Sequence, residues 1–206
     1  MKPLSRFTMR WQPLLIAMMV AIVFPLPVAA HLNSTGLGPA YDGALHFLMS
    51  PEDLVPALAL ALFAGLRGAA YGRKALFLLP GAWLVGGLAG LARSSNASSS
   101  ITAISFLILG GLIAADVRVS QRAISILAVM LGILHGYLNG SGMTGAGGAA
   151  VALLGLITVV FILVALVTSF VVRIQVPWAR IAVRVAGSWI AASGLLMAGW
   201  ALRRGA

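Results

Sequence analysis

One stretch of the chain constrains its fold more than any other: the 24 residues from 149 to 172 contain no charged side chain. A membrane-spanning helix needs about 20 consecutive apolar residues, because the hydrocarbon core of a bilayer is about 30 Å thick. The whole chain shares this character, with 61% hydrophobic residues, 9% charged residues and a mean hydropathy of +1.04. Since soluble domains carry about 25% charged residues, the sequence predicts an all-α, polytopic membrane helical bundle.

Apolar runs separated by basic or glycine-rich loops predict about six transmembrane helices. The predicted spans are residues 51–66, 75–92, 101–115, 123–138, 149–172 and 185–202. The second span is expected to be interrupted at Pro80-Gly81, because proline lacks a backbone N–H. Small residues recur along the spans and are predicted to allow close helix packing in lipid. They are Gly86, Gly87, Gly90, Gly110, Gly111, Gly187 and Gly194.

Residues 1–30 have the pattern of a cleavable signal peptide. Three basic residues precede an apolar run of about a dozen residues, and small side chains end the segment at Val28-Ala29-Ala30. Cleavage after Ala30 would leave His31 as the new N-terminus, outside the cytoplasm, and 31–206 as a single transmembrane domain. The alternative is an uncleaved first helix.

The basic residues predict which way the bundle faces. With six spans and an external N-terminus, eight of them fall in cytoplasmic loops and three outside, as the positive-inside rule requires. The eight are Arg67, Arg73, Lys74, Arg118, Arg122, Arg173, Arg180 and Arg184, and the three are Arg93, Arg203 and Arg204. We therefore expect a multi-pass protein of the bacterial inner membrane, in contact with the lipid bilayer, with both termini periplasmic. The same pattern explains the net charge of +10 without a nucleic-acid partner.

The chain has no cysteine, so a metal site would have to use histidine, carboxylate, backbone oxygen or methionine sulfur. Asp42 and His46 stand four residues apart, on one face of a short external or re-entrant helix. His135 is predicted at the outer end of the fourth span, on the same side as His31. We predict a metal site built from His46, Asp42, His135 and His31. The alternatives are a histidine–aspartate pair that only anchors the segment, and a buried, hydrogen-bonded His135.

The other acidic residues have simpler interpretations. Ser50, Pro51 and the acids Glu52 and Asp53 form a strong helix start, in which the carboxylates complement the positive end of the helix dipole. Asp116, at the end of the third span, is interpreted as a boundary charge.

Several motifs together resemble the HupE/UreJ family. They are the Gly-x-Gly-Pro-x-Tyr-Asp-Gly-x-x-His-Phe segment at 36–47, Ser-Pro-Glu-Asp-Leu at 50–54, Leu-x-Ala-Gly-Leu-Arg-Gly at 62–68, Pro-x-x-Trp-Leu-x-Gly-Gly at 80–87 and His135-Gly136. The resemblance implies nickel or cobalt uptake in bacteria, often beside hydrogenase or urease genes. Better-known members carry a His-x5-Asp-His motif in the first helix, whereas this chain has a single histidine there, arranged Asp42-x-x-x-His46.

We therefore expect a permease or metal-acquisition protein for a divalent transition metal (nickel or cobalt, with copper or zinc as further options) and neither an enzyme nor a protein with a tightly bound cofactor. One alternative is a non-transporting membrane partner or assembly factor of a metalloenzyme. The expected partners are hydrogenase- or urease-type metalloenzyme machinery or further copies of the chain in a homo-oligomer. A more remote alternative is an intramembrane serine hydrolase using His135 and Ser141.

Overall fold

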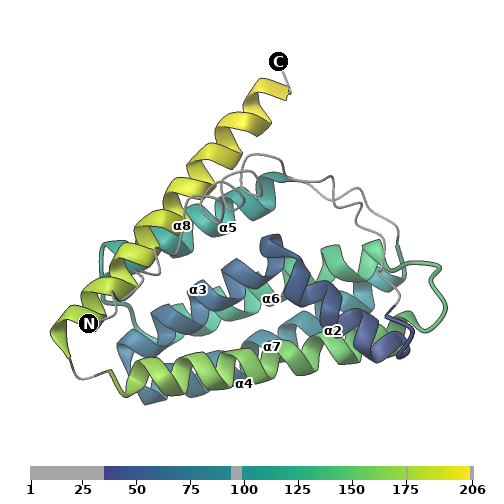
Figure 1. Ribbon diagram of the computed structural model, residues 1–206, viewed down its shortest axis with the longest axis horizontal. Helices are drawn as coiled ribbons and strands as arrows, with labels where there is room; N and C mark the ends of the chain where they lie inside the picture. Colours follow the sequence, from purple (N-terminus) through teal and green to yellow (C-terminus); the bar gives the residue numbers. More distant parts are fainter. Residues whose placement is uncertain (1–34, 94–98, 175, 205–206) are drawn as a thin grey trace, which may run out of the picture. The chain divides into compact units, whose positions relative to one another are not determined.

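The computed structural model describes residues 35–93, 99–174 and 176–204, which form seven α-helices and no strand (Figure 1). The predicted signal peptide and His31 lie outside these residues. The helices are α2 (Pro39–Met49), α3 (Pro51–Arg67), α4 (Ala69–Leu91), α5 (Ser99–Ala114), α6 (Gln121–Gly142), α7 (Ala149–Val172) and α8 (Pro177–Arg204). The predicted all-α class is confirmed, and each predicted span coincides with a helix.

Four of these helices, α4, α6, α7 and α8, are long and apolar enough to cross a membrane by themselves. Helices α2 and α3 meet this criterion only as a pair bent by 74°, and α5 is a shorter apolar helix. The chain is thus a helical membrane protein with four full-length candidate spans, or five if the bent pair is one span. The expected interruption at Pro80 is wrong, since α4 continues through it. Membrane helices tolerate an internal proline because neighbouring helices and side chains can satisfy the backbone groups that it leaves free.

The bend between α2 and α3 lies at Ser50, the residue before a proline. A proline ring disfavours helical backbone in the preceding residue, and Ser50 is extended, with φ −102° and ψ 92°. Pro51 then opens α3, as predicted, although the Ser50 side chain makes no capping hydrogen bond. The predicted short helix before the first span is confirmed as α2.

Glycines bring neighbouring helices into backbone contact, which confirms their predicted packing role at six of the seven positions; Gly111 alone faces open space. The most extensive helix contact is between α4 and α6, which run parallel. A Cβ on Gly136 would collide with the backbone of Trp83, and one on Gly140 with the backbone of Gly87. In lipid, where apolar surface gives no attraction between helices, such close contact is the main source of association.

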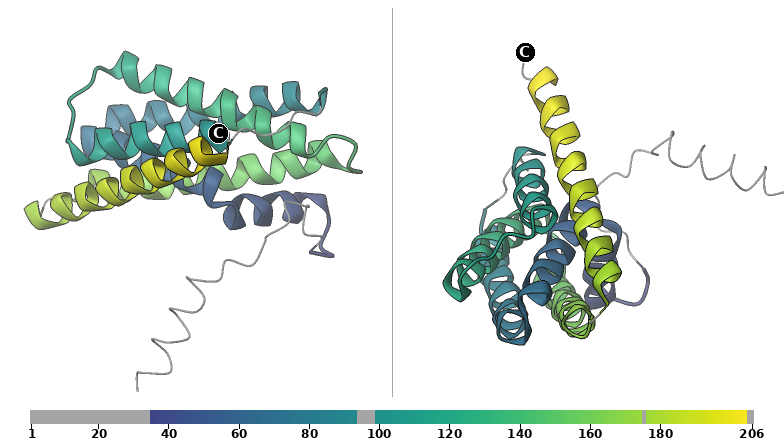
Figure 2. Two further views of the ribbon diagram at one scale, coloured as in Figure 1. Left: turned by 90° about the horizontal axis from the view of Figure 1, so that it is seen from above. Right: turned by 90° about the vertical axis from the view of Figure 1, so that its left-hand side faces the viewer.

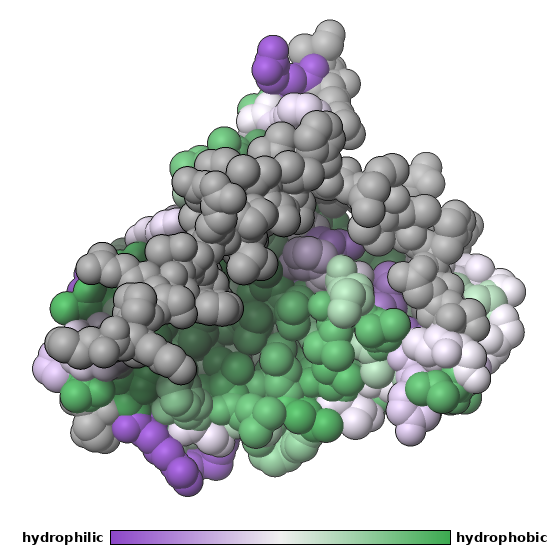
Figure 3. Space-filling view, viewed as in Figure 1, coloured by the Kyte–Doolittle hydropathy of each residue, from purple (hydrophilic) through white to green (hydrophobic). Residues whose placement is uncertain are grey.

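Helices α3 to α8 alternate in direction along the bundle. Helix α5 packs antiparallel to α8 (Figures 1 and 2), and α4 packs antiparallel to α7. The ends of α3, α5 and α7 therefore meet the starts of α4, α6 and α8, and all eight basic residues predicted to be cytoplasmic flank this basic end. There Arg67 forms an ion pair with Asp116. Figure 3 shows a broad hydrophobic surface over the helices, with hydrophilic residues confined to separate patches.

Candidate functional site

Four polar side chains are buried together in the half of the bundle away from the basic end. They are Asp53 at the start of α3, Ser105 in α5, and His135 and Asn139 one turn apart in α6. His135 is fully buried, and the other three have 4 to 8% of their surface exposed. Ionisable side chains inside a membrane protein are costly to bury and mark functional sites.

The glycines of α6 position this cluster. Gly132, Gly136 and Gly140 lie four residues apart and form the stripe that contacts α4. His135 and Asn139 occupy the adjacent stripe, which turns them toward α3 and α5. The close approach at Gly136 also sets the Trp83 ring 5.6 Å from the His135 ring, and Phe47 of α2 meets Trp83 edge-on at 5.7 Å.

Hydrogen bonds define the arrangement of the acid and the imidazole. His135 Nδ1 is 2.9 Å from Asp53 Oδ1, and Asn139 Nδ2 donates to Asp53 Oδ2 at 2.8 Å. An ionised carboxylate only accepts hydrogen bonds, so Nδ1 carries the proton when Asp53 is charged. In the neutral imidazole, the second nitrogen, Nε2, then has a free lone pair.

That lone pair faces Ser105. Its Oγ is 3.1 Å from His135 Nε2 and 2.9 Å from the carbonyl oxygen of Ile101, one turn earlier in α5. A hydroxyl has one hydrogen and can donate to only one of these acceptors at a time. When it donates to Ile101, an oxygen and a nitrogen lone pair stand 3.1 Å apart, and a cation bound by both would lie to one side of the line that joins the two atoms.

Two buried polar atoms beside this network have no partner. They are the side-chain oxygen of Asn139, Oδ1, and the indole N–H of Trp83. A buried polar group without a hydrogen bond costs about 1–3 kcal/mol, and such groups in a native structure commonly indicate an absent ligand, ion or water. The Asn139 oxygen is an acceptor and so suits a cation.

The residues that the sequence predicts as metal ligands do not all lie in this buried cluster. Asp42 accepts hydrogen bonds from the backbone N–H and hydroxyl of Thr35, at the start of α2. His46 is half-buried on the same helix, next to Phe47. Only His135 belongs to the buried cluster. Within the described ranges, no three histidine, cysteine or acidic side chains gather closely enough to hold a metal ion.

Sequence reasoning missed the importance of Asp53. Its interpretation as a helix-start charge suits its exposed neighbour Glu52, but Asp53 is itself buried against two side chains of α6. A periodicity signal was available, because Asp53 shares a helical face with the buried residues Ala57, Leu60 and Ala64. No pattern in the sequence distinguishes Ser105 or Asn139 from the other polar residues of the helices.

These features define a class: a helical membrane protein with a buried acid–imidazole–amide site. Comparison with known families agrees with this class, since the sequence profile described as "HupE / UreJ protein" matches residues 17–197. The chain belongs to the HupE/UreJ family, which is associated with nickel and cobalt handling and with hydrogenase and urease maturation. No curated protein and no solved structure matches the chain.

Proposed function

We propose that this protein takes up a divalent transition-metal ion, of the nickel or cobalt kind, through the buried site formed by Asp53, Ser105, His135 and Asn139. The observation that carries the proposal is the unpartnered Asn139 oxygen beside a buried carboxylate and imidazole. The metal is cargo in this scheme. His46 and Asp42 on α2, and His31 if it becomes the N-terminus, would meet the ion before it reaches the site.

The donor set suits such an ion. It combines an imidazole nitrogen with hydroxyl and amide oxygens, and imidazole-containing sites favour nickel, copper and zinc over calcium or magnesium. Two ligands at right angles on one ion, each about 2.1 Å from it, lie about 3.0 Å apart. The 3.1 Å between His135 Nε2 and Ser105 Oγ matches this spacing. Asp53 would hold the ring in place through Nδ1 and offset the charge of the ion.

The modest strength of the site favours transit over storage. Structural metal sites use four strong protein ligands, whereas His135 is the one strong ligand that the four residues of this cluster offer to an ion at Nε2. Conduction requires binding that is favourable enough for the ion to enter and weak enough for it to leave. With two charges crossing 100 mV, the membrane potential supplies about 4.6 kcal/mol for inward movement.

The test is uptake of radiolabelled nickel and cobalt by cells that express Asn139→Leu, which removes the unpartnered oxygen. Uptake at limiting metal is expected to fall at least tenfold, in line with losses at sites that orient metal ligands. Ser141→Ala, two residues further along α6, is the matched control, since Ser141 bonds only to the carbonyl of Leu138. His46→Ala should raise the metal concentration needed for half-maximal uptake while leaving the maximal rate unchanged.

Two outcomes would redirect the proposal. If the Asn139→Leu variant took up metal at the wild-type rate, the buried site would not lie on the metal pathway. Metal binding by purified protein without any metal flux in liposomes would favour the alternative role, a non-transporting partner of a metalloenzyme.

A second candidate is an intramembrane serine hydrolase, because Ser105, His135 and Asp53 stand in the order of a catalytic triad. The nucleophile in this candidate is Ser105, whose hydroxyl lies beside His135, and not Ser141 as in the hypothesis drawn from the sequence. Ser105 Oγ would attack an acyl carbonyl while its proton passes to His135 Nε2, and His135 would then give that proton to the leaving group as its bond to the carbonyl carbon breaks. Water, deprotonated by His135, would hydrolyse the acyl ester, and the proton would return to Ser105. Labelling by a serine-directed fluorophosphonate, lost in Ser105→Ala and kept in Ser141→Ala, would support this activity. An unlabelled wild type would rule it out.

A further inference from the structure

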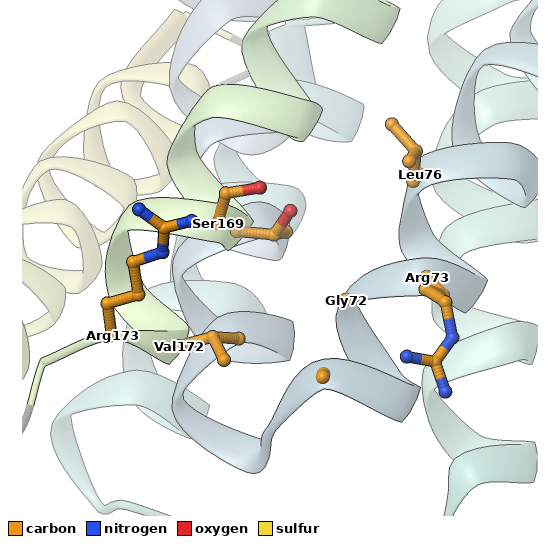
Figure 4. A pocket seen from close by; sticks show the side chains of 8 residues that line it. Gly72, Arg73, Leu76, Ser169, Val172 and Arg173 are labelled. Carbon is orange, nitrogen blue, oxygen red and sulfur yellow. The ribbon is translucent and has the colours of Figure 1, made fainter.

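A cavity of about 230 Å³ opens at the basic end of the bundle, between the start of α4 and the end of α7 (Figure 4). Gly72 lies on its floor, where the helices are close enough for a Cβ to touch Thr168 at 3.2 Å. Figure 4 shows Arg73 of α4 and Arg173 of α7 on opposite sides of the cavity, with the Arg173 guanidinium on the side of Ser169 and the Arg73 side chain pointing away from it. Ser169 adds a hydroxyl to the lining.

The charge of this cavity is uncompensated. Neither Arg73 nor Arg173 forms an ion pair within the described part of the chain. Of the four acidic residues in the sequence, only Asp116 lies at this end, and it is paired with Arg67. Two guanidinium groups with a nearby hydroxyl are the donors that recognise phosphate oxygens.

An apolar groove of about 850 Å³ adjoins the cavity at Arg173, which lines both. The groove runs between Leu62 of α3, Phe170 of α7 and the start of α8, where Ala179 and Ala182 leave room. Trp178 on its wall is 70% exposed, as is typical of the aromatic side chains that sit at membrane–water interfaces. A charged cavity thus continues into an apolar groove.

We propose that this surface is a binding site for an anionic phospholipid of the phosphatidylglycerol class. The phosphate binds beside Arg173 and Ser169, the exposed Arg73 side chain turns toward it across the cavity, and an acyl chain lies in the groove along α8. A free phosphate ion would use the cavity but not the groove. A zwitterionic lipid would bring its own cation toward the two arginines, so the charge of the cavity favours a headgroup with net negative charge.

The test measures lipid retention by the full-length protein in detergent, using native mass spectrometry with phosphatidylglycerol and phosphatidylcholine of identical chains. The double variant Arg73→Gln/Arg173→Gln should bind phosphatidylglycerol about 25-fold more weakly, or about fivefold for each arginine, with phosphatidylcholine unchanged. Arg118→Gln/Arg122→Gln is the matched control, because it removes two exposed charges at the same end outside the cavity. That control should change binding by less than about threefold, as expected for charges that only contribute to the general field.

Two further measurements distinguish binding of the lipid headgroup from binding of the acyl chain. Ala182→Trp, which fills the groove, should weaken retention of both lipids and leave binding of glycerol phosphate unchanged. Equal losses in the two double variants would overturn the proposal in favour of diffuse attraction. Glycerol phosphate binding as tightly as the intact lipid would overturn it in favour of a free-phosphate site.

Discussion

Asp53→Asn is expected to lower metal uptake at limiting metal by about 10- to 100-fold while the protein remains folded. The substitution keeps the shape of the side chain and its hydrogen bond from His135 Nδ1. It removes the only negative charge of the buried cluster, and a dication in a low-dielectric site is strongly destabilised without a compensating charge. Radiolabelled nickel uptake, normalised to the amount of protein in the membrane, measures the effect.

Glu52→Gln is the matched control, because it makes the same chemical change one residue earlier in the same helical turn. Glu52 is exposed, so uptake should stay within about twofold of wild type, as for surface charges in general. If the two variants transported equally well, Asp53 would have only a structural role, and the buried site would not lie on the metal pathway.

Gly136→Ala is expected to lower the stability of the bundle, because this glycine lies directly against the backbone of α4. The added Cβ would meet the backbone of Trp83, which cannot move aside as a flexible side chain can, so α4 and α6 must separate. Overpacking of this kind costs about 1–3 kcal/mol. The shift should be measured as the free energy of unfolding in detergent micelles, with tryptophan fluorescence as the probe.

Gly81→Ala makes the same substitution in the interior of α4, at a position where a Cβ meets nothing within 4 Å. Because alanine favours the helical state over glycine, this variant should be more stable than wild type by about 0.5–1 kcal/mol. If both variants changed stability in the same direction and by the same amount, helix propensity and not helix contact would explain the result.

The candidate site shows how far sequence reasoning reaches. Asp53 and His135 were both visible as rare ionisable residues in an apolar chain, but they are 82 positions apart. Their pairing depends on how α3 and α6 are placed in the bundle. Asp42 and His46 lie four residues apart on α2, as their spacing predicts. Asp42 accepts hydrogen bonds from Thr35, and a metal role for this pair stays a prediction.

The sequence by itself determined the features that depend on local chemistry. Apolar runs specified helices in a membrane, Pro51 specified the start of α3, and the arginines and lysine specified one basic end. These follow from hydropathy, backbone geometry and charge, which act over a few residues or one helix length.

Only the tertiary structure decided which helices are neighbours, and with them the acid–imidazole–amide cluster and the basic cavity. Small residues permit contact on many helix faces, and lipid gives no hydrophobic preference among them. The fit of particular glycines against particular backbones therefore selects the partners. That choice places Ser105 and Asp53 on either side of His135, where no sequence pattern joins them.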